Sequence, residues 1–156
     1  MIDVIIRAKE EIKRADHLIF VSLKYTRTVD VIKSIIERLI NTYDVVVTGI
    51  LEKAEEEMKI FEVPKVPKQR VEEVLKLYPD DTMKDYLQFL LFLKKLDKAE
   101  YTCSCEYRKH VHMTATFPKG EAVQVNMDDL KEYFIKTKEF IVYIENLHVI
   151  PGDEDK

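Results

Sequence analysis

The residues with the greatest potential for chemistry lie at positions 100–117, which read EYTCSCEYRKHVHMTATF. Both cysteines of the chain and two of its four histidines are here: Cys103, Cys105, His110 and His112. Two thiolates and two imidazoles suit tetrahedral zinc. The spacing is unlike common zinc motifs, however, because only one residue separates the two members of each pair, whereas two to four residues usually stand between zinc-binding cysteines.

The alternation of apolar and polar residues in this segment separates the thiols from the imidazoles. A half-buried strand is predicted because Val111, Met113, Ala115 and Phe117 alternate with polar residues. The cysteines share the odd-numbered, inward phase, and the histidines share the outward phase. A bulge at Lys109 would change this assignment. The pattern therefore favours buried thiols and exposed histidines, no cofactor is predicted, and metal binding stays the weaker alternative.

The outward face of this strand and of the one that follows is a candidate binding surface. Its residues are Arg108, His110, His112, Thr114 and Gln124. Cationic and hydrogen-bonding side chains of this kind can bind phosphate or an RNA backbone. No aromatic residue lies on the face to stack on a base, and an ordinary solvated strand has a similar composition. Both interpretations stay open.

The sequence contains no recognisable catalytic motif. The acidic run at 52–57 and the aspartate pairs at 80–81 and 128–129 fit solvated helix faces and helix starts. His17 lies near the end of the first predicted helix and is interpreted as a packed or exposed helix residue. There is no glycine-rich phosphate loop, nucleophile elbow or HExxH motif. We therefore predict no catalytic residues, and the sequence favours a protein that is not an enzyme.

Composition restricts the class of protein further. The 156 residues are 46% apolar and 35% charged, and the longest apolar run, at 89–93, is too short to cross a bilayer. The charged N-terminal segment lacks a signal pattern, so we predict a cytoplasmic protein without membrane contact. A net charge of −4 argues against a dedicated nucleic-acid binder. Few amides and abundant Lys, Glu and Ile are typical of thermophiles.

Apolar residues spaced by three and four predict five helices, at 1–23, 29–60, 67–78, 82–101 and from 127 onward. The second is expected to run through Gly49, although a bend there is an alternative. The fourth is apolar around most of its circumference and is therefore expected to be the most buried. In the last helix, Tyr133 and Phe140 are expected to flank a buried stripe of Met127, Leu130, Phe134, Thr137, Ile141 and Ile144.

A β-hairpin is predicted at about 107–127. A three-residue loop at 118–120 ends in a glycine, which suits a type I turn closed by a left-handed residue. This loop pairs Ala115 with Val123 and Met113 with Val125, so apolar residues face each other. Asn126 is then expected to cap the last helix, as Asp81 caps the fourth.

Together these elements predict a mainly α fold, a single-domain bundle of four long helices and one short helix with the hairpin before the last helix. The domain is expected to cover residues 1–150, and residues 151–156 to form a frayed tail.

Two blocks carry a resemblance to known proteins: ADHLIFVSL…VDVIKSIIERLINTYDVVVTGIL and LLFLKKLDKAEY…EYRKHVHMTATF…VNMDDLKEYFIKTKEFI. They resemble a group of uncharacterised archaeal helical proteins, which in turn resembles the HEPN superfamily of helical bundles. HEPN proteins occur beside nucleotidyltransferases and in RNases of defence systems. The resemblance implies an all-α core, a homodimer, and a protein partner such as a nucleotidyltransferase.

The ribonuclease branch of that superfamily uses an Arg followed by four to six residues and a His. Here Arg14 is too close to His17 and Arg7 is too far from it, while only three residues separate Arg108 from His112. Ribonuclease activity is therefore not carried over to this chain.

The leading functional prediction is a non-catalytic cytosolic helical bundle that binds another macromolecule or itself, with the second and last helices as self-association surfaces. The alternative is a HEPN-like RNA-associated protein, binding RNA or acting as a ribonuclease or toxin, that uses the outer hairpin face. A metal-binding protein is the weaker alternative.

Overall fold

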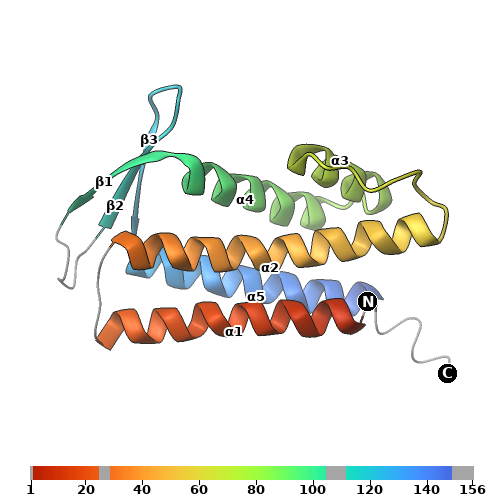
Figure 1. Ribbon diagram of the computed structural model, residues 1–156, viewed down its shortest axis with the longest axis horizontal. Coiled ribbons are helices and arrows are strands. Elements are labelled where there is room, and N and C mark those ends of the chain that lie inside the picture. Colours follow the sequence, from red (N-terminus) through yellow and green to blue (C-terminus); the bar gives the residue numbers. More distant parts are fainter. Residues whose placement is uncertain (1, 25–28, 105–111, 149–156) are drawn as a thin grey trace.

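The computed structural model describes residues 2–24, 29–104 and 112–148, and the side chains at 22–24, 29, 103, 104, 112 and 148 are outside the description. The elements in chain order are α1 (Ile2–Lys24), α2 (Val29–Glu56), α3 (Pro67–Leu77), α4 (Asp81–Lys98), β1 (Glu100–Ser104), β2 (His112–Thr116), β3 (Ala122–Asn126) and α5 (Met127–His148) (Figure 1). The predicted mainly α class, with strands before the last helix, is confirmed. Residues 149–156, which include the predicted tail, lie outside the description.

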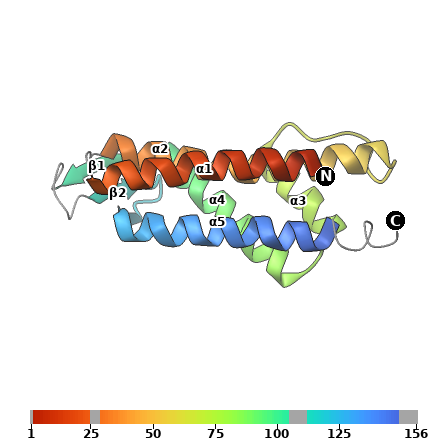
Figure 2. The same cartoon turned by 90° about the horizontal axis from the view of Figure 1, so that it is seen from below.

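Helix α2 is the centre of the bundle. It packs against α1, α3, α4 and α5 and also touches β2 (Figures 1 and 2). Its buried apolar residues surround much of the helix: Ile32, Ile35, Ile36, Leu39, Ile40, Tyr43, Val46, Val47, Ile50, Leu51 and Ala54. The expectation that the fourth helix is the most buried was therefore wrong. In α4, Phe89, Leu91 and Phe92 are only half-buried, because this helix lies at the side of the bundle.

Helix α2 continues without a break through Gly49, as its helical spacing predicted. The glycine serves close packing rather than a bend. A Cβ atom added at Gly49 would lie 2.5 Å from Cγ2 of Val4 on α1, so only a residue without a side chain allows this approach.

Helix α4 is shorter than predicted at its C-terminal end. The backbone becomes extended at Ala99, whose N–H bonds to the carbonyl of Leu96, and residues 100–104 form β1. β1 pairs antiparallel with β2, so the strand order is β1-β2-β3 and the predicted hairpin is part of a three-stranded sheet. Tyr101 and Thr102 favour extended backbone, and a third strand stabilises a hairpin that is marginal by itself.

The predicted hairpin register is confirmed. Ala115 pairs with Val123 and Met113 with Val125. The N–H of Phe117 donates to the carbonyl of Glu121 at 2.8 Å, and the N–H of Gly120 donates to that of Phe117 at 2.9 Å. Gly120 has φ of 92°, which is the left-handed conformation the loop requires.

The predicted cap of α5 is also confirmed. The N–H of Asp129 donates to Oδ1 of Asn126 at 2.9 Å, and the N–H of Asn126 donates to Oδ2 of Asp129 at 3.0 Å. This reciprocal pair satisfies two backbone donors at the helix start. Two details differ from expectation: Asp80 rather than Asp81 is the N-cap of α4, and Phe140 is fully buried whereas Phe134 is half-buried.

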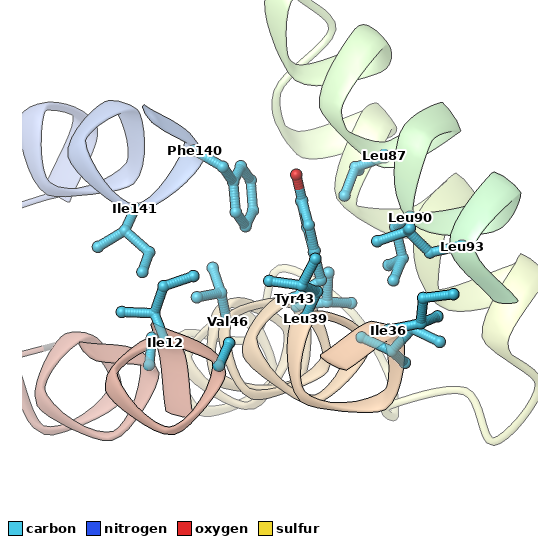
Figure 3. Packing of buried hydrophobic residues seen from close by; sticks show 14 of the residues in the cluster. Ile12, Ile36, Leu39, Tyr43, Val46, Leu87, Leu90, Leu93, Phe140 and Ile141 are labelled. Carbon is cyan, nitrogen blue, oxygen red and sulfur yellow. The ribbon is translucent and has the colours of Figure 1, made fainter. Parts of the chain in front are cut away.

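One connected cluster of buried side chains joins all five helices to β2 and β3. At its centre Tyr43 stacks on Phe140 with ring centroids 4.5 Å apart, between the leucines of α4 and the isoleucines of α1 and α5 (Figure 3). None of the helices in the described ranges combines the length and apolar content that a membrane crossing needs.

Candidate functional site: a groove between the first and last helices

The sequence-predicted binding face is described only in part. Thr114 and Gln124 pair across β2 and β3, with Gln124 exposed and Thr114 half-buried. Arg108 and His110 lie outside the described residues, as does the side chain of His112. The structure therefore brings together two uncharged members of the predicted set, and the RNA-binding role of this face stays a prediction.

The four candidate metal ligands, Cys103, Cys105, His110 and His112, have no described side chains. The backbone of Cys103 pairs with Met113 in the sheet register, while Cys105 and His110 lie outside the description. Within the described part of the chain, no group of three His, Cys, Asp or Glu side chains is placed to hold a metal ion. The metal-binding alternative is therefore untested.

A groove of about 670 Å³ lies between α1 and α5, which run antiparallel side by side (Figure 2). Ile12 of α1 and Ile141 of α5 belong to the buried stripes of their helices and meet at the floor of the groove (Figure 3). Its rim carries Lys9, Lys13, Asp16, Lys138, Glu139 and Glu145. The groove thus has an apolar floor and charges of both signs at its edges.

Helix α5 exposes apolar side chains beside this groove. Ile135 and Val142 line it and are each 54% exposed. They are seven residues apart, which places them on the same side of the helix, two turns from each other. These β-branched residues lie outside the stripe that α5 buries in the bundle, so they form an apolar surface that none of the described helices covers.

Charged residues lie on the same side of α5 as Ile135 and Val142 and form one row with them. Lys131, Ile135, Lys138, Val142 and Glu145 follow one another at spacings of four and three along α5. The row is basic toward the N-terminal end of the helix and acidic toward the C-terminal end. Lys9 of α1 crosses the groove to bond Oε2 of Glu145 at 3.0 Å.

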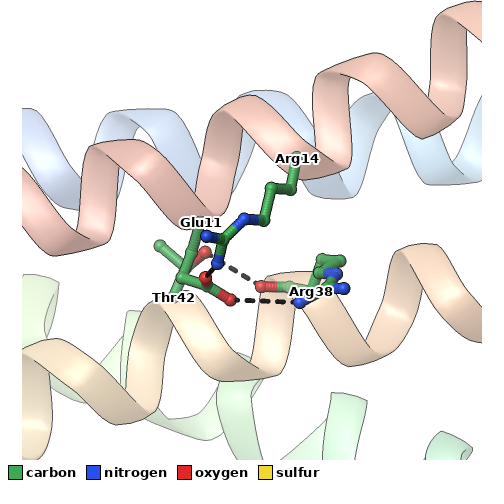
Figure 4. A network of polar contacts seen from close by, with 4 residues as sticks. All are labelled: Glu11, Arg14, Arg38 and Thr42. Carbon is green, nitrogen blue, oxygen red and sulfur yellow. Dashed lines mark hydrogen bonds and ion pairs between the residues drawn. The ribbon is translucent and has the colours of Figure 1, made fainter.

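A polar cluster joins α1 to α2. It includes Arg14 and lies beside His17, a pair compared above with the Arg and His of ribonucleases. Glu11 accepts a hydrogen bond from Arg14, and its other oxygen lies 3.6 Å from Nη1 of Arg38 (Figure 4). Thr42 donates to the carbonyl of Arg38 at 2.9 Å. Arg14 is therefore held in an ion pair within α1, and Glu11 joins this pair to Arg38 of α2, while His17 lies nearby beside a shallow hollow.

The tyrosines between α2, α4 and α5 are packing groups. Burial raises the pKa of Tyr43 far above its usual value and that of Tyr133 to about 12. The polar side chain of Thr137 beside the Tyr43 hydroxyl lowers this pKa and so offsets part of the rise that burial causes. Even so, among the described side chains no group meets hydrogen-bond geometry with the Tyr43 hydroxyl, since Thr137 donates to the carbonyl of Tyr133. These phenols stay protonated at neutral pH and cannot act as bases there.

Sequence reasoning missed the groove, although α5 carried a signal for it. Ile135 and Val142 repeat at a helical spacing but are out of phase with the buried stripe, as expected for a helix with two apolar faces. No family model, curated protein or solved structure matches the chain. The resemblance to HEPN proteins therefore stays a prediction.

Proposed function

We propose that this chain is a non-catalytic module that associates with a second copy of itself through the α1/α5 groove. The observation that carries the proposal is the row on α5 in which Ile135 and Val142 are exposed between charges of opposite sign. Apolar surface that has no partner within a chain is typical of an interaction site.

The row is complementary to itself when two copies of α5 cross antiparallel about a two-fold axis near Lys138. Ile135 then faces Val142 of the second copy, and Lys131 faces Glu145 of the second copy. The two Lys138 side chains lie beside the axis, and Glu139 of the opposite copy lies next to each of them and offsets their mutual repulsion. Two-fold symmetry repeats each of these contacts, so an apolar pair lies on either side of the axis and opposite charges meet at both ends of the row.

Helix α2, the other self-association surface expected from the sequence, has its apolar stripe covered within the bundle. Among its described side chains, the exposed ones are all polar: Asp30, Ser34, Glu37, Asn41, Glu52, Glu55 and Glu56. This leaves α5, with α1 beside it, as the helix that offers apolar surface to a partner.

The expected association is weak. Completing the burial of four half-exposed β-branched side chains contributes about 1 kcal/mol each, since full burial is worth about 1.5–3 kcal/mol. Association costs at least about 4 kcal/mol in lost translational and rotational freedom. These two contributions nearly cancel, so the dimer depends on the additional contacts of the groove and its rim and forms only at high protein concentration.

Sedimentation equilibrium at protein concentrations from about 10 to 500 µM tests the proposal, because the fraction of a weak dimer rises with protein concentration. The wild-type chain should shift toward dimer, and the Ile135→Asp/Val142→Asp variant should stay monomeric with unchanged helicity. Phe61→Asp is the matched control, since Phe61 is 96% exposed outside the groove. A wild-type chain that is monomeric throughout, or a dimer that the Ile135/Val142 variant retains, refutes the proposal.

A charge exchange tests the antiparallel geometry separately. Lys131→Glu should weaken the dimer because it places a second carboxylate against Glu145 of the second copy. Adding Glu145→Lys should restore the dimer. If both variants dimerise equally, the two α5 helices do not meet in this register.

A further inference from the structure

A second cavity, of about 360 Å³, lies between the C-terminal end of α4 and the turn that joins β2 to β3. Its lining residues are Lys95, Lys98, Ala99, Phe117, Pro118, Lys119 and Glu121. The turn projects beyond α4 on the side of α2 away from α1, so this cavity is separate from the α1/α5 groove (Figure 1). Its volume falls within the range of about 300–1,000 Å³ that is usual for small-molecule sites.

The walls of the cavity are apolar and held in place. Phe117 is buried, and its backbone N–H and carbonyl both bond within the turn, to Glu121 and Gly120. On the α4 side, the Nζ atom of Lys95 lies 4.6 Å from the centroid of the Phe117 ring. This cation–π contact fixes one ammonium group at the rim and joins the helix to the turn.

The rim carries a surplus of positive charge. Three lysines, Lys95, Lys98 and Lys119, surround the cavity with one carboxylate, that of Glu121. Asp97 on the same helix is engaged elsewhere, with Oδ1 3.7 Å from Nζ of Lys33. As far as the structure describes the chain, none of the three ammonium groups forms an ion pair.

The partial negative charge at the C-terminal end of α4 neutralises only part of the positive charge of the three lysines. The C-terminal end of a helix carries the equivalent of about half a negative charge, and Lys95 and Lys98 in the last turn more than offset it. Lys119, on the opposite wall, adds to the positive potential. An anion that enters between Lys98 and Lys119 is therefore attracted from two sides.

We propose that this cavity binds a small organic anion, with a carboxylate or phosphate head between Lys98 and Lys119 and an apolar body against Phe117 and Pro118. Neither part suffices alone. A bare inorganic ion would leave the apolar wall uncovered, and a neutral apolar molecule would leave the ammonium groups without a partner. Binding at this cavity does not depend on self-association through α5.

Titration of the ¹⁵N-labelled full chain with phenyl phosphate, followed by amide NMR shifts, tests the proposal. Saturable shifts should appear at Ala99, Lys119, Gly120 and Glu121, with a dissociation constant on the order of 1 mM, as expected for a ligand of this size. Phenylacetate tests a carboxylate head, and the tighter of the two ligands identifies the head group. Benzyl alcohol and inorganic phosphate supply each part without the other and should bind at least about tenfold more weakly.

The Lys98→Gln/Lys119→Gln variant keeps most of the length of both side chains but removes their charge, and should bind phenyl phosphate about tenfold more weakly. Lys84→Gln, an exposed lysine of α4 outside the cavity, should leave binding unchanged. The absence of saturable shifts with both organic anions, equal affinity of the double variant, or equal affinity for inorganic phosphate would each overturn the proposal.

Discussion

Gly49→Ala is the substitution for which the structure and simple helix propensity predict opposite results. Gly49 lies inside α2, facing α1. A Cβ atom at this position would be 2.5 Å from Cγ2, 2.7 Å from Cγ1 and 3.1 Å from Cβ of Val4. Real Cβ atoms essentially never approach other atoms within 3.0 Å, so the two helices would have to move apart or Val4 would have to shift.

The expected magnitude combines two opposing contributions. Replacing glycine by alanine inside a helix normally stabilises by about 0.5–1 kcal/mol. Overpacking a filled interface costs about 1–3 kcal/mol, and valine cannot relieve the overlap easily because helical backbone favours one of its rotamers. We therefore expect Gly49→Ala to lower the free energy of unfolding by about 0.5–2 kcal/mol, which corresponds to a fall in Tm of a few degrees.

A double-mutant cycle measured by urea unfolding tests this reasoning. Val4→Ala alone should cost about 1.5 kcal/mol, because two nearly buried methyl groups are lost. In the double variant, the methyl group introduced at position 49 occupies the space that the Val4 side chain vacated. The double variant should therefore be more stable than the sum of the single effects predicts, by about 1 kcal/mol.

Two outcomes would refute the steric explanation. One is a Gly49→Ala variant that is as stable as the wild type or more stable, as helix propensity alone would give. The other is additivity of the two substitutions to within about 0.5 kcal/mol, which would show that residues 4 and 49 do not compete for space.

Three further predictions concern a buried phenol, a helix cap and a turn. Tyr43→Phe should leave the free energy of unfolding at pH 7 unchanged or raise it by about 1 kcal/mol, because the described side chains offer the buried hydroxyl no hydrogen bond and the variant no longer buries it. Folding raises the pKa of Tyr43, so the folded protein holds the phenol proton more tightly than the unfolded chain does. Above about pH 10 this difference lowers the free energy of unfolding by about 1.4 kcal/mol per pH unit. Urea unfolding between about pH 8 and 11 should show this loss in the wild type, and the Tyr43→Phe variant should lack the part that Tyr43 causes. Asn126→Ala should cost about 1 kcal/mol in thermal unfolding, whereas Asn126→Asp, which keeps the acceptor for Asp129, should cost little. Gly120→Ala should cost about 1–2 kcal/mol because its φ is 92°, and Gly120→Asn should cost less; equal effects would show that backbone conformation is not responsible.

Local pattern determined most of the elements of this fold. The spacing of Ile5, Ala8 and Ile12 specifies one face of α1, and a face of that kind is recognisable whatever it packs against. The β2–β3 register followed from the three-residue loop and the alternation around Ala115, because slipping by one residue would turn every side chain to the other face. The Asn126 cap was likewise predictable, since its hydrogen bonds span three residues.

The tertiary structure alone decided which apolar faces are covered. The leucines and phenylalanines of α4 suggested the most buried helix, but α2 occupies the centre because four helices pack around it. Burial depends on neighbours that are distant in sequence, so the composition of one helix does not determine it. The same reason explains why the sequence predicts a continuous helix through Gly49 but does not reveal that this glycine is the contact point for Val4.

The candidate sites show the same division. The sequence predicted α5 as a self-association surface, and the lysines of α4 and of the turn were visible as separate residues. Only the fold places Ile135 and Val142 beside a groove, and only the fold brings Lys98 and Lys119 to one cavity. Periodicity specifies which residues share a face of one element, whereas a site between elements depends on how those elements pack.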